Sequence, residues 1–320
     1  MNNQLVKIDN LRTYFYTAEG VVKAVDGVDL MINKGETLGL LGESGCGKTQ
    51  TALSIIRLIP SPGKIIAGKV LFEGQDLLQK SEEQLREIRG NRIAMIFQDP
   101  MTSLNPVYAV GEQIAEVFYA HRKIFGTEAW TRAVKEMELV GIPEAQLRSN
   151  DYPHQFSGGM RQRIMIAMAL ACSPSLLIAD EPTTALDVTA QAQILELMKK
   201  LRKEVNTSIM LITHDVGVIA ELCDRVAVMY AGKVVESSDV RTILKEPLHP
   251  YTQGLLQSLP RGRKTEARLI PIGGQVPSMI NLPNGCRFRT RCSKALPECE
   301  VEPNLVEVKP GHMVRCLLFS

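Results

Sequence analysis

The fold is decided by residues 37–49, which read TLGLLGESGCGKT. Thr37–Leu41 is a short apolar run that predicts a buried strand, and the residues after Lys48 predict a helix. The stretch between them, Gly42–Thr49, matches every position of the phosphate-loop pattern G-x-x-x-x-G-K-[ST]. Its backbone N–H groups would surround a β-phosphate, Lys48 would reach the β and γ oxygens, and the Thr49 hydroxyl would bind Mg²⁺. A glycine-rich turn without a ligand is the alternative, which the strand–loop–helix context disfavours.

A second apolar run, Leu176–Ala179, ends in two adjacent carboxylates, Asp180 and Glu181. Successive side chains of a strand point to opposite faces, so the two acids can serve separate tasks. In a phosphoryl-transfer site Asp180 would hold Mg²⁺ and Glu181 would polarise the attacking water. Two solvated acids at the end of a strand are the alternative when the pair is considered alone.

A further candidate anion site opens the helix that is expected through Ile164–Ala171. Its start reads Ser157-Gly158-Gly159-Met160-Arg161-Gln162. A capping serine hydroxyl and glycines at a helix N-terminus leave N–H groups available for an anion. A plain helix cap after a loop is the alternative, since a chain with one phosphate loop does not need a second such site.

Short apolar strands alternate with amphipathic stretches from Leu5 to about Ser237, which is typical of an α/β domain. We expect a domain over residues 1–239 with a helical insert at about 100–165, and a small irregular extension over 240–320, where proline becomes frequent. Further expected elements are strands at Val28–Ile32 and Ile209–Ile212, a helical stretch at Val110–Val140, and a hairpin of Val226–Tyr230 with Lys233–Glu236.

Composition excludes several classes of protein. The chain has 320 residues, of which 45% are hydrophobic, and 37 basic against 35 acidic side chains give a net charge of +2. This composition is that of a globular protein with about two domains, and it gives no support for nucleic-acid binding. The longest apolar run, Ile164–Cys172, is far shorter than the roughly 20 residues of a membrane span. The first residues lack the pattern of an export signal, so a cytoplasmic location is expected.

Taken together, the motifs resemble those of ABC-transporter ATPases in order and spacing, over residues 5 to about 238. The set comprises the phosphate loop, Phe97-Gln98-Asp99, Phe156 to Arg163, Asp180 to Asp187, and Thr213-His214-Asp215. The resemblance implies an ABC-type nucleotide-binding domain that binds ATP and Mg²⁺. It also implies a head-to-tail pair of such domains, in which the Ser157–Gln162 motif of one closes over ATP held by the other.

The resemblance also assigns roles by position. It implies catalytic roles for Lys48, Gln98, Glu181 and His214, with Gln98 joining Thr49 and Asp180 at Mg²⁺ and His214 at the γ-phosphate. Phe15 is expected to stack on adenine, although Tyr14 or Tyr16 could replace it. The full nucleotide-contact set that is implied comprises Phe15, Gly42, Glu43, Ser44, Gly45, Cys46, Gly47, Lys48, Thr49, Gln50, Gln98, Asp180, Ser157, Gly158, Gly159, Gln162 and Asp187.

Four of the seven cysteines lie in the last 35 residues, as Cys286, Cys292, Cys299 and Cys316. Disulfides are disfavoured in the cytoplasm, so a metal is the first interpretation. The spacing lacks the close pairs of zinc modules, which favours a [4Fe–4S] cluster over Zn²⁺ and over free thiols or disulfides. Interspersed basic residues would offset the charge of a thiolate cluster, or would simply form a solvated loop; they are Arg287, Arg289, Arg291 and Lys294.

Two segments of the extension, residues 247–256 and 285–292, resemble the C-terminal region of ATPase subunits of dipeptide, oligopeptide and nickel importers. The resemblance implies a peripheral subunit on the cytoplasmic face of the membrane, paired with a second ATPase subunit on two permease subunits. An extracytoplasmic peptide-binding protein would supply the substrate. Nickel or another small solute is the alternative cargo. A soluble ABC ATPase of DNA repair or translation is the rival from another class, disfavoured by the single phosphate loop and the short helical insert.

Overall fold

The computed structural model describes residues 3–99, 103–184, 186–205, 207–258 and 272–319. Contacts divide the chain into two compact units. Unit 1 comprises Met1, Asn33–Thr37 and Gln79–Ile212, and unit 2 comprises Asn2–Ile32, Leu38–Leu78 and Thr213–Ser320. Residues on both sides of position 240 belong to unit 2, and the expected domain boundary there stays a prediction. Among the described helices, none combines the length and apolar character of a membrane span.

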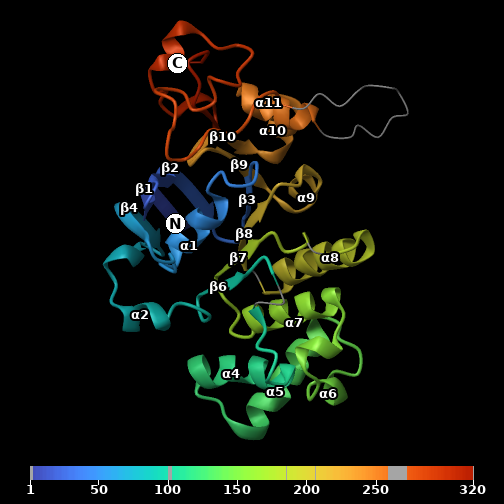
Figure 1. The fold of residues 1–320 in the computed structure, drawn as a ribbon. Coiled ribbons are helices and arrows are strands. Elements are labelled where there is room, and N and C mark those ends of the chain that lie inside the picture. The colour runs from blue at the N-terminus through green and yellow to red at the C-terminus, as the bar shows by residue number, and fades with distance from the viewer. Residues whose placement is uncertain (1–2, 100–102, 185, 206, 259–271, 320) are drawn as a thin grey trace, which may run out of the picture. The chain divides into compact units, whose positions relative to one another are not determined.

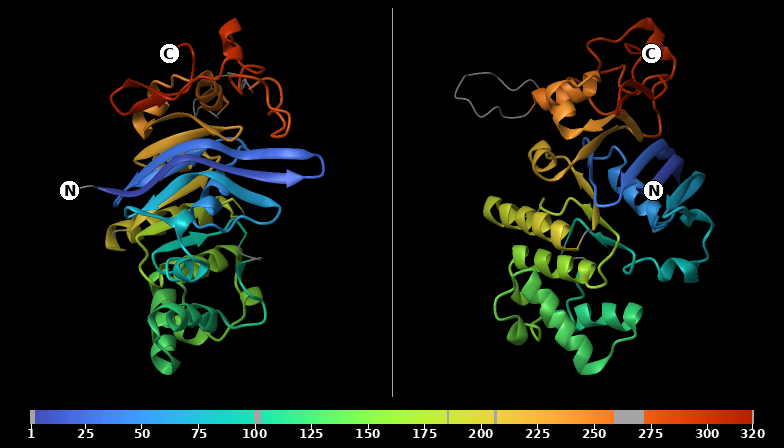
Figure 2. Two further views of the ribbon diagram at one scale, coloured as in Figure 1. Left: turned by 90° about the vertical axis from the view of Figure 1, so that its left-hand side faces the viewer. Right: turned by 180° about the vertical axis from the view of Figure 1, so that it is seen from behind.

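An antiparallel sheet forms one layer of unit 2, and its long strands are seen side by side in Figure 2. The strand order is β2-β1-β4-β5. The strands are β1 (Gln4–Thr17), β2 (Gly20–Asn33), β4 (Gly63–Phe72) and β5 (Gln75–Asp76). Alternating apolar residues such as Val6 and Ile8 bury one face of β1.

The phosphate loop of unit 2 connects β3 (Thr37–Leu41), which is buried along its whole length, with α1 (Lys48–Ile55). β3 pairs in parallel with β9 (Arg225–Tyr230), and β9 pairs antiparallel with β10 (Lys233–Asp239). The sheet continues through two strands of the extension, β12 (His312–Val314) and β11 (Val306–Lys309). The predicted strand–loop–helix and hairpin are confirmed.

Short helices of unit 2 begin at side chains that cap them. The helices are α9 (Val216–Leu222), α10 (Val240–Lys245) and α11 (Pro250–Gln257), and a 3₁₀ turn, η3, spans Pro297–Glu300. Their caps, Asp215, Asp239 and His249, each accept an N–H of the first turn. Figure 1 shows α10 and α11 beside β10, next to the C-terminal segment.

One apolar cluster joins the extension to the strands around the phosphate loop. Leu41, the last residue of β3, shares this cluster with Tyr230, Tyr251 and Phe288. The Tyr230 ring centroid lies 4.6 Å from that of Tyr251 and 5.2 Å from that of Phe288. Three buried aromatic side chains give this contact a large hydrophobic area, so the extension shares a hydrophobic core with the strands around the phosphate loop.

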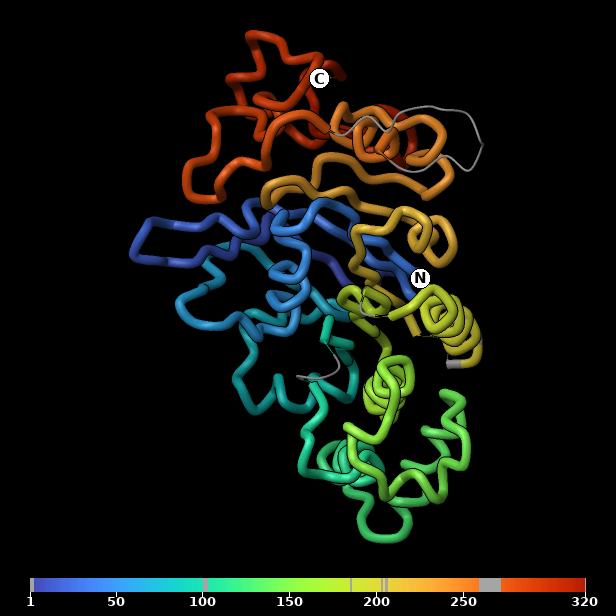
Figure 3. The backbone as a smooth tube through the Cα atoms, turned by 45° about the vertical axis from the view of Figure 1, so that its right-hand side comes forward, coloured from blue at the N-terminus to red at the C-terminus, as the bar shows by residue number. Residues whose placement is uncertain are grey.

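Unit 1 contains three parallel strands with β7 in the middle, and its helices are seen in Figure 3. The strands are β6 (Ile93–Ile96), β7 (Leu176–Asp180) and β8 (Ser208–Thr213). Its helices are α2 (Glu82–Arg86), α4 (Val110–Arg122), α5 (Gly126–Leu139), α6 (Ala145–Arg148), α7 (Gly158–Leu170) and α8 (Val188–Val205). A 3₁₀ turn of unit 1, η2, spans Pro153–Gln155, and another, η1 (Leu77–Gln79), lies where the sequence passes from unit 2 to unit 1. The helical stretch expected at Val110–Val140 is two helices, because Lys123 ends α4 with a φ of 52°.

Candidate nucleotide site

The backbone of the phosphate loop requires glycine at the positions that the motif specifies. Gly47 precedes α1 with a φ of 105°, and a Cβ there would lie 2.1 Å from the carbonyl oxygen of Ala24. A Cβ at Gly42 would lie 2.3 Å from the carbonyl oxygen of Met229. No side chain caps α1, so its first turn keeps N–H groups available for an anion. These features fit a bound nucleotide phosphate.

Lys48 is the cation of this loop, and its side chain is nearly buried, with the residue 5% exposed. Its Nζ donates to the carbonyl oxygens of Gly42, at 2.7 Å, and Glu43, at 3.1 Å. The ammonium is therefore held by the loop itself. Burial raises the pKa of the neighbouring Cys46 thiol, which keeps that side chain neutral beside Lys48.

In unit 1 the two carboxylates stand at the end of β7, as expected. Asp180 is 2% exposed. Glu181 has a φ of 47°, a left-handed conformation that is strained for a residue other than glycine and is held by an N–H bond to Ile212 O at 2.9 Å. Its Oε2 accepts bonds from Gln98 Nε2 at 3.1 Å and from Thr184 Oγ1 at 2.9 Å. The structure thus brings Gln98 and Glu181, two of the predicted catalytic residues, into direct contact.

Ser157 begins α7, and its Oγ accepts the N–H of Met160 at 3.4 Å. Ser157 and Gly158 are exposed, whereas Gln162 is 1% exposed. The motif rests on Arg148, whose guanidinium lies 4.4 Å from the centroid of the Phe156 ring and donates to Gln155 O at 3.2 Å. Sequence reasoning missed Arg148, since nothing in its local sequence connects it with the motif.

The three consecutive aromatic residues near the start of the chain, Tyr14, Phe15 and Tyr16, lie in different environments. Tyr14 donates its hydroxyl to Asp26 at 2.7 Å, and burial together with this carboxylate raises the pKa of Tyr14 to about 12. Phe15 is half-buried opposite Gly63, and Tyr16 is 47% exposed. Tyr14 is engaged by Asp26, so Phe15 and Tyr16 are better candidates for adenine stacking.

The remaining predicted contacts lie at the ends of elements. His214 is exposed and directly follows β8, and Asp187 is exposed and accepts the N–H of Ala190 at 2.9 Å. Thr49 and Gln50 are half-buried in α1. The phosphate loop and His214 belong to unit 2, while the residues at the ends of β6 and β7 and the Ser157 motif belong to unit 1.

The four clustered cysteines lie in one region of the extension as thiols that are not joined in disulfides. The N–H groups of Lys294 and Leu296 donate to Cys292 Sγ and Cys299 Sγ, each at 3.4 Å. Burial raises the pKa of Cys286 to about 11 and raises the pKa values of Cys292 and Cys316. Among the described residues no group of three or more His, Cys, Asp or Glu side chains is arranged to hold a metal. The thiols as placed therefore do not fit the expected metal site.

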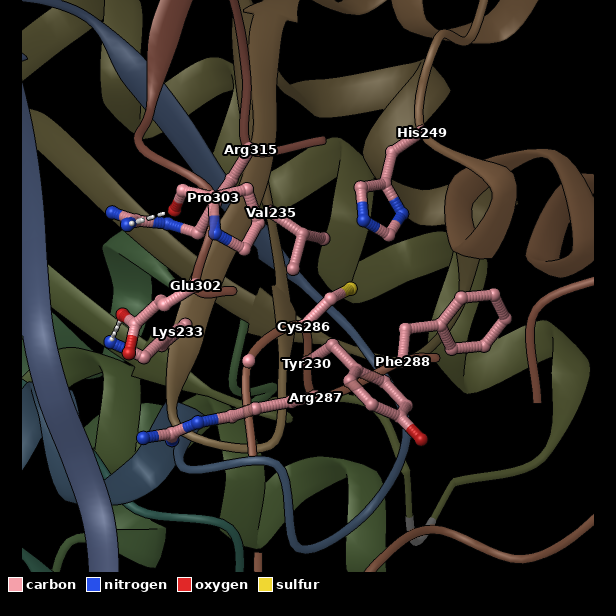
Figure 4. A pocket seen from close by; sticks show the side chains of 11 residues that line it. Tyr230, Lys233, Val235, His249, Cys286, Arg287, Phe288, Glu302, Pro303 and Arg315 are labelled. Atoms are coloured by element: carbon pink, nitrogen blue, oxygen red, sulfur yellow. Dashed lines mark hydrogen bonds and ion pairs between the residues drawn. The ribbon is translucent and has the colours of Figure 1, made fainter. Parts of the chain in front are cut away.

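A small pocket borders Cys286, as Figure 4 shows. Its lining combines Tyr230 and Phe288 with three cationic side chains, Lys233, Arg287 and Arg315. Two of these cations bind other residues of the lining: Lys233 forms an ion pair with Glu302, and Arg315 donates to Pro303 O at 3.2 Å. Arg287 forms an ion pair with Asp26. Of the cations expected to balance a thiolate cluster, Arg287 thus has a carboxylate partner of its own.

Comparison with known proteins decides the family. A family model described as ABC transporter matches residues 25–184, which is half of the chain. The chain belongs to the ABC transporter ATPases. A second model, described as the C-terminal region of oligopeptide/dipeptide transporters, matches residues 235–299 of this ABC ATPase. The predicted fold class and family are confirmed.

Relatives match this ABC ATPase over nearly its full length. It is 53% identical to a probable peptide ABC transporter ATP-binding protein, y4tR, of Sinorhizobium fredii, over 98% of this chain and 94% of the relative. It is also 53% identical to the oligopeptide transport ATP-binding protein AppD of Bacillus subtilis, over 99% of this chain and 97% of the relative. Among solved structures, it resembles the dimeric ATP-binding cassette MJ0796 bound to ADP and Pi, with a TM-score of 0.67 and 29% identity, over 74% of this chain and 99% of that chain.

Proposed function

We propose that this ABC ATPase hydrolyses ATP to energise the import of oligopeptides or dipeptides through a membrane transporter. The observation that carries the proposal is the pairing, in one chain, of an ABC transporter match with an oligopeptide/dipeptide transporter match in the extension. Full-length relatives named as peptide and oligopeptide transport proteins support it. The phosphate loop supplies the physical basis for nucleotide binding.

Within the site, we assign roles from the chemistry of each group. The loop N–H groups and Lys48 would bind the phosphates, and Thr49, Asp180 and Gln98 would hold Mg²⁺, which when bound neutralises phosphate charge. Glu181 would accept a proton from the attacking water, oriented by its bond from Gln98. The remaining roles fall to His214 at the γ-phosphate, Phe15 at adenine, and Asp187 and the Ser157 motif at the dimer interface.

We further propose the assembly in which the enzyme works. Two ATPase subunits would pair head to tail on two permease subunits, on the cytoplasmic face of the membrane, and an extracytoplasmic peptide-binding protein would deliver the substrate. The dimeric relative MJ0796 supports the pairing. ATP would favour the closed pair and hydrolysis would release it, so that the permeases experience a cycle of motion.

The test is co-purification of the chain with its membrane partners, followed by ATP hydrolysis assays with the isolated solute-binding component. A mixed peptide library should stimulate phosphate release, and Ni²⁺ should not. Stimulation by Ni²⁺ and not by peptides would replace peptide import with nickel import. Loss of hydrolysis in Lys48→Ala is the control that assigns the activity to this chain.

Metal binding by the four cysteines is a separate proposal, with a [4Fe–4S] cluster preferred to Zn²⁺. The proposal rests on the grouping of the cysteines in the sequence. Binding would require the thiols to converge from their positions in the structure. Anaerobic purification with metal analysis decides: about four irons per chain supports the cluster, one zinc supports the alternative, and an absence of metal excludes both.

A further inference from the structure

Glu43, the second residue of the phosphate loop, forms an ion pair with the C-terminal extension. Arg291 binds it with both terminal nitrogens: Nη1 lies 2.7 Å from Oε2, and Nη2 lies 3.1 Å from Oε1. The Arg291 side chain is 4% exposed and that of Glu43 is 29% exposed. Such bidentate pairs fix orientation as well as distance. The extension therefore sets the direction of the Glu43 side chain.

The extension holds the backbone of the same residue through Tyr251. The Tyr251 hydroxyl oxygen accepts the Glu43 N–H at 2.9 Å. Tyr251 is fully buried on α11 and packs against the rings of Tyr230 and Phe288. Its ring has little freedom to move, so the hydroxyl is a fixed point for the loop.

Arg291 is itself held from several sides. Its Nε donates to Gly273 O at 3.0 Å, and Nη1 lies 3.4 Å from the hydroxyl of Tyr230. The Arg291 N–H donates to Phe288 O at 2.9 Å. Contacts other than Glu43 thus fix the position of the Arg291 side chain, as is required of a residue that positions another group.

Glu43 transmits this position to the groups that would touch phosphate. Its carbonyl oxygen accepts Lys48 Nζ at 3.1 Å and the Cys46 N–H at 3.3 Å. A displacement of Glu43 would therefore move the ammonium of Lys48 and the turn that precedes α1.

A second contact braces the other side of the loop. Arg287, labelled in Figure 4, donates to Ala231 O and pairs with Asp26. The adjacent Gly232 N–H donates to Cys46 O at 2.8 Å, and Gly232 O accepts the Asp26 N–H at 2.9 Å. The extension thus reaches the phosphate loop by two independent routes.

From these contacts we propose that the extension positions the phosphate loop for ATP, with Arg291 acting through Glu43 as the main positioning residue and Tyr251 as its companion. The proposal rests on the proposed ATP site at Gly42–Thr49. It gives the extension a role in nucleotide binding, in addition to its association with a class of transporter.

The test compares Arg291→Gln with the wild type in MgATP affinity and in steady-state hydrolysis by the assembled transporter. We expect at least tenfold weaker MgATP binding and a similar rise in KM, with kcat at saturating ATP changed less than threefold. Arg291→Lys keeps the charge but cannot bind both carboxylate oxygens of Glu43 in the same way, so its MgATP affinity should lie between those of Arg291→Gln and the wild type. The matched control is Arg289→Gln, because Arg289 lies in the same segment and pairs with the exposed Glu300 instead of the loop.

Tyr251→Phe tests the proposal where Arg291→Gln fails to fold, because it removes one oxygen atom and keeps the ring. It should weaken MgATP binding about threefold to tenfold. Glu43→Gln combined with Arg291→Gln should be far less severe than the product of the single effects, since the two residues act as a pair. This inference alone is overturned if the MgATP affinity of Arg291→Gln lies within twofold of that of a wild type that binds MgATP. If Arg291→Gln does not fold, the same criterion applies to Tyr251→Phe. A wild type that does not bind MgATP would overturn the proposed function as well.

Discussion

Glu181→Gln is the sharpest perturbation of the proposed chemistry. The variant retains a side-chain oxygen that can accept from Gln98 and Thr184, the two groups that bind Oε2. Glutamine has the same backbone preferences as glutamate, so the strain at a φ of 47° is present in both proteins and cancels. The substitution therefore removes the proton acceptor with little change in packing.

The expected loss follows from that change. A positioned general base contributes roughly 10²–10⁴-fold to a rate, equivalent to about 3–5 kcal/mol of transition-state stabilisation. We expect kcat for ATP hydrolysis to fall by this factor, while MgATP affinity stays within about threefold and Tm within a few degrees.

The assay is phosphate release by the assembled transporter, with MgATP affinity and thermal unfolding measured on the same preparations. Glu138→Gln, an exposed residue of α5, is the matched control and should resemble the wild type. Turnover of Glu181→Gln within tenfold of the wild type would refute Glu181 as the base.

Three further predictions concern the loop, the pH dependence of stability, and the cysteines. Gly47→Ala, whose Cβ would lie 2.1 Å from Ala24 O, should abolish MgATP binding in an affinity measurement, whereas Gly126→Ala, also at positive φ but in open space, should not. Burial lowers the pKa of His249 to about 3, so the unfolded chain binds more protons from pH 6.5 down to 3, and stability falls as the pH falls through this range. Between pH 7 and 5 the free energy of unfolding should fall by about 2 kcal/mol. In urea titrations, His249→Asn, which keeps a capping oxygen, should not show this fall. An equal fall in both proteins would contradict the assignment. Cys292→Ser should lower the metal content of anaerobically purified protein, with Cys223→Ser as the control, and unchanged metal would remove Cys292 from the ligand set.

The sequence predicted the parts of the fold that local patterns determine. The phosphate loop needs glycine for steric reasons that its motif records, and the buried runs at Leu176–Ala179 and Ile209–Ile212 are strands. The family resemblance placed Gln98 and Glu181 together among the catalytic residues, but it did not predict their direct contact, which joins residues 83 positions apart.

Other features could not be predicted because they depend on tertiary contacts. Arg291 appeared in the sequence as one of several basic residues near the cysteines, and its partner Glu43 lies 248 positions away. The expected charge balance at the cysteines is wrong for Arg287 and Arg291, because each is paired with a carboxylate elsewhere. The break at Lys123, which divides the expected helical stretch Val110–Val140, was not predicted from the sequence either.

Coupling of ATP hydrolysis to peptide import is the activity proposed for this chain. The most direct measurement is uptake of a labelled peptide mixture into proteoliposomes that contain the chain, the membrane subunits that co-purify with it, and the solute-binding component. Uptake should require ATP on the side of this subunit and should be lost in Lys48→Ala and in Glu181→Gln. ATP-independent uptake, or uptake that persists in both variants, would contradict it.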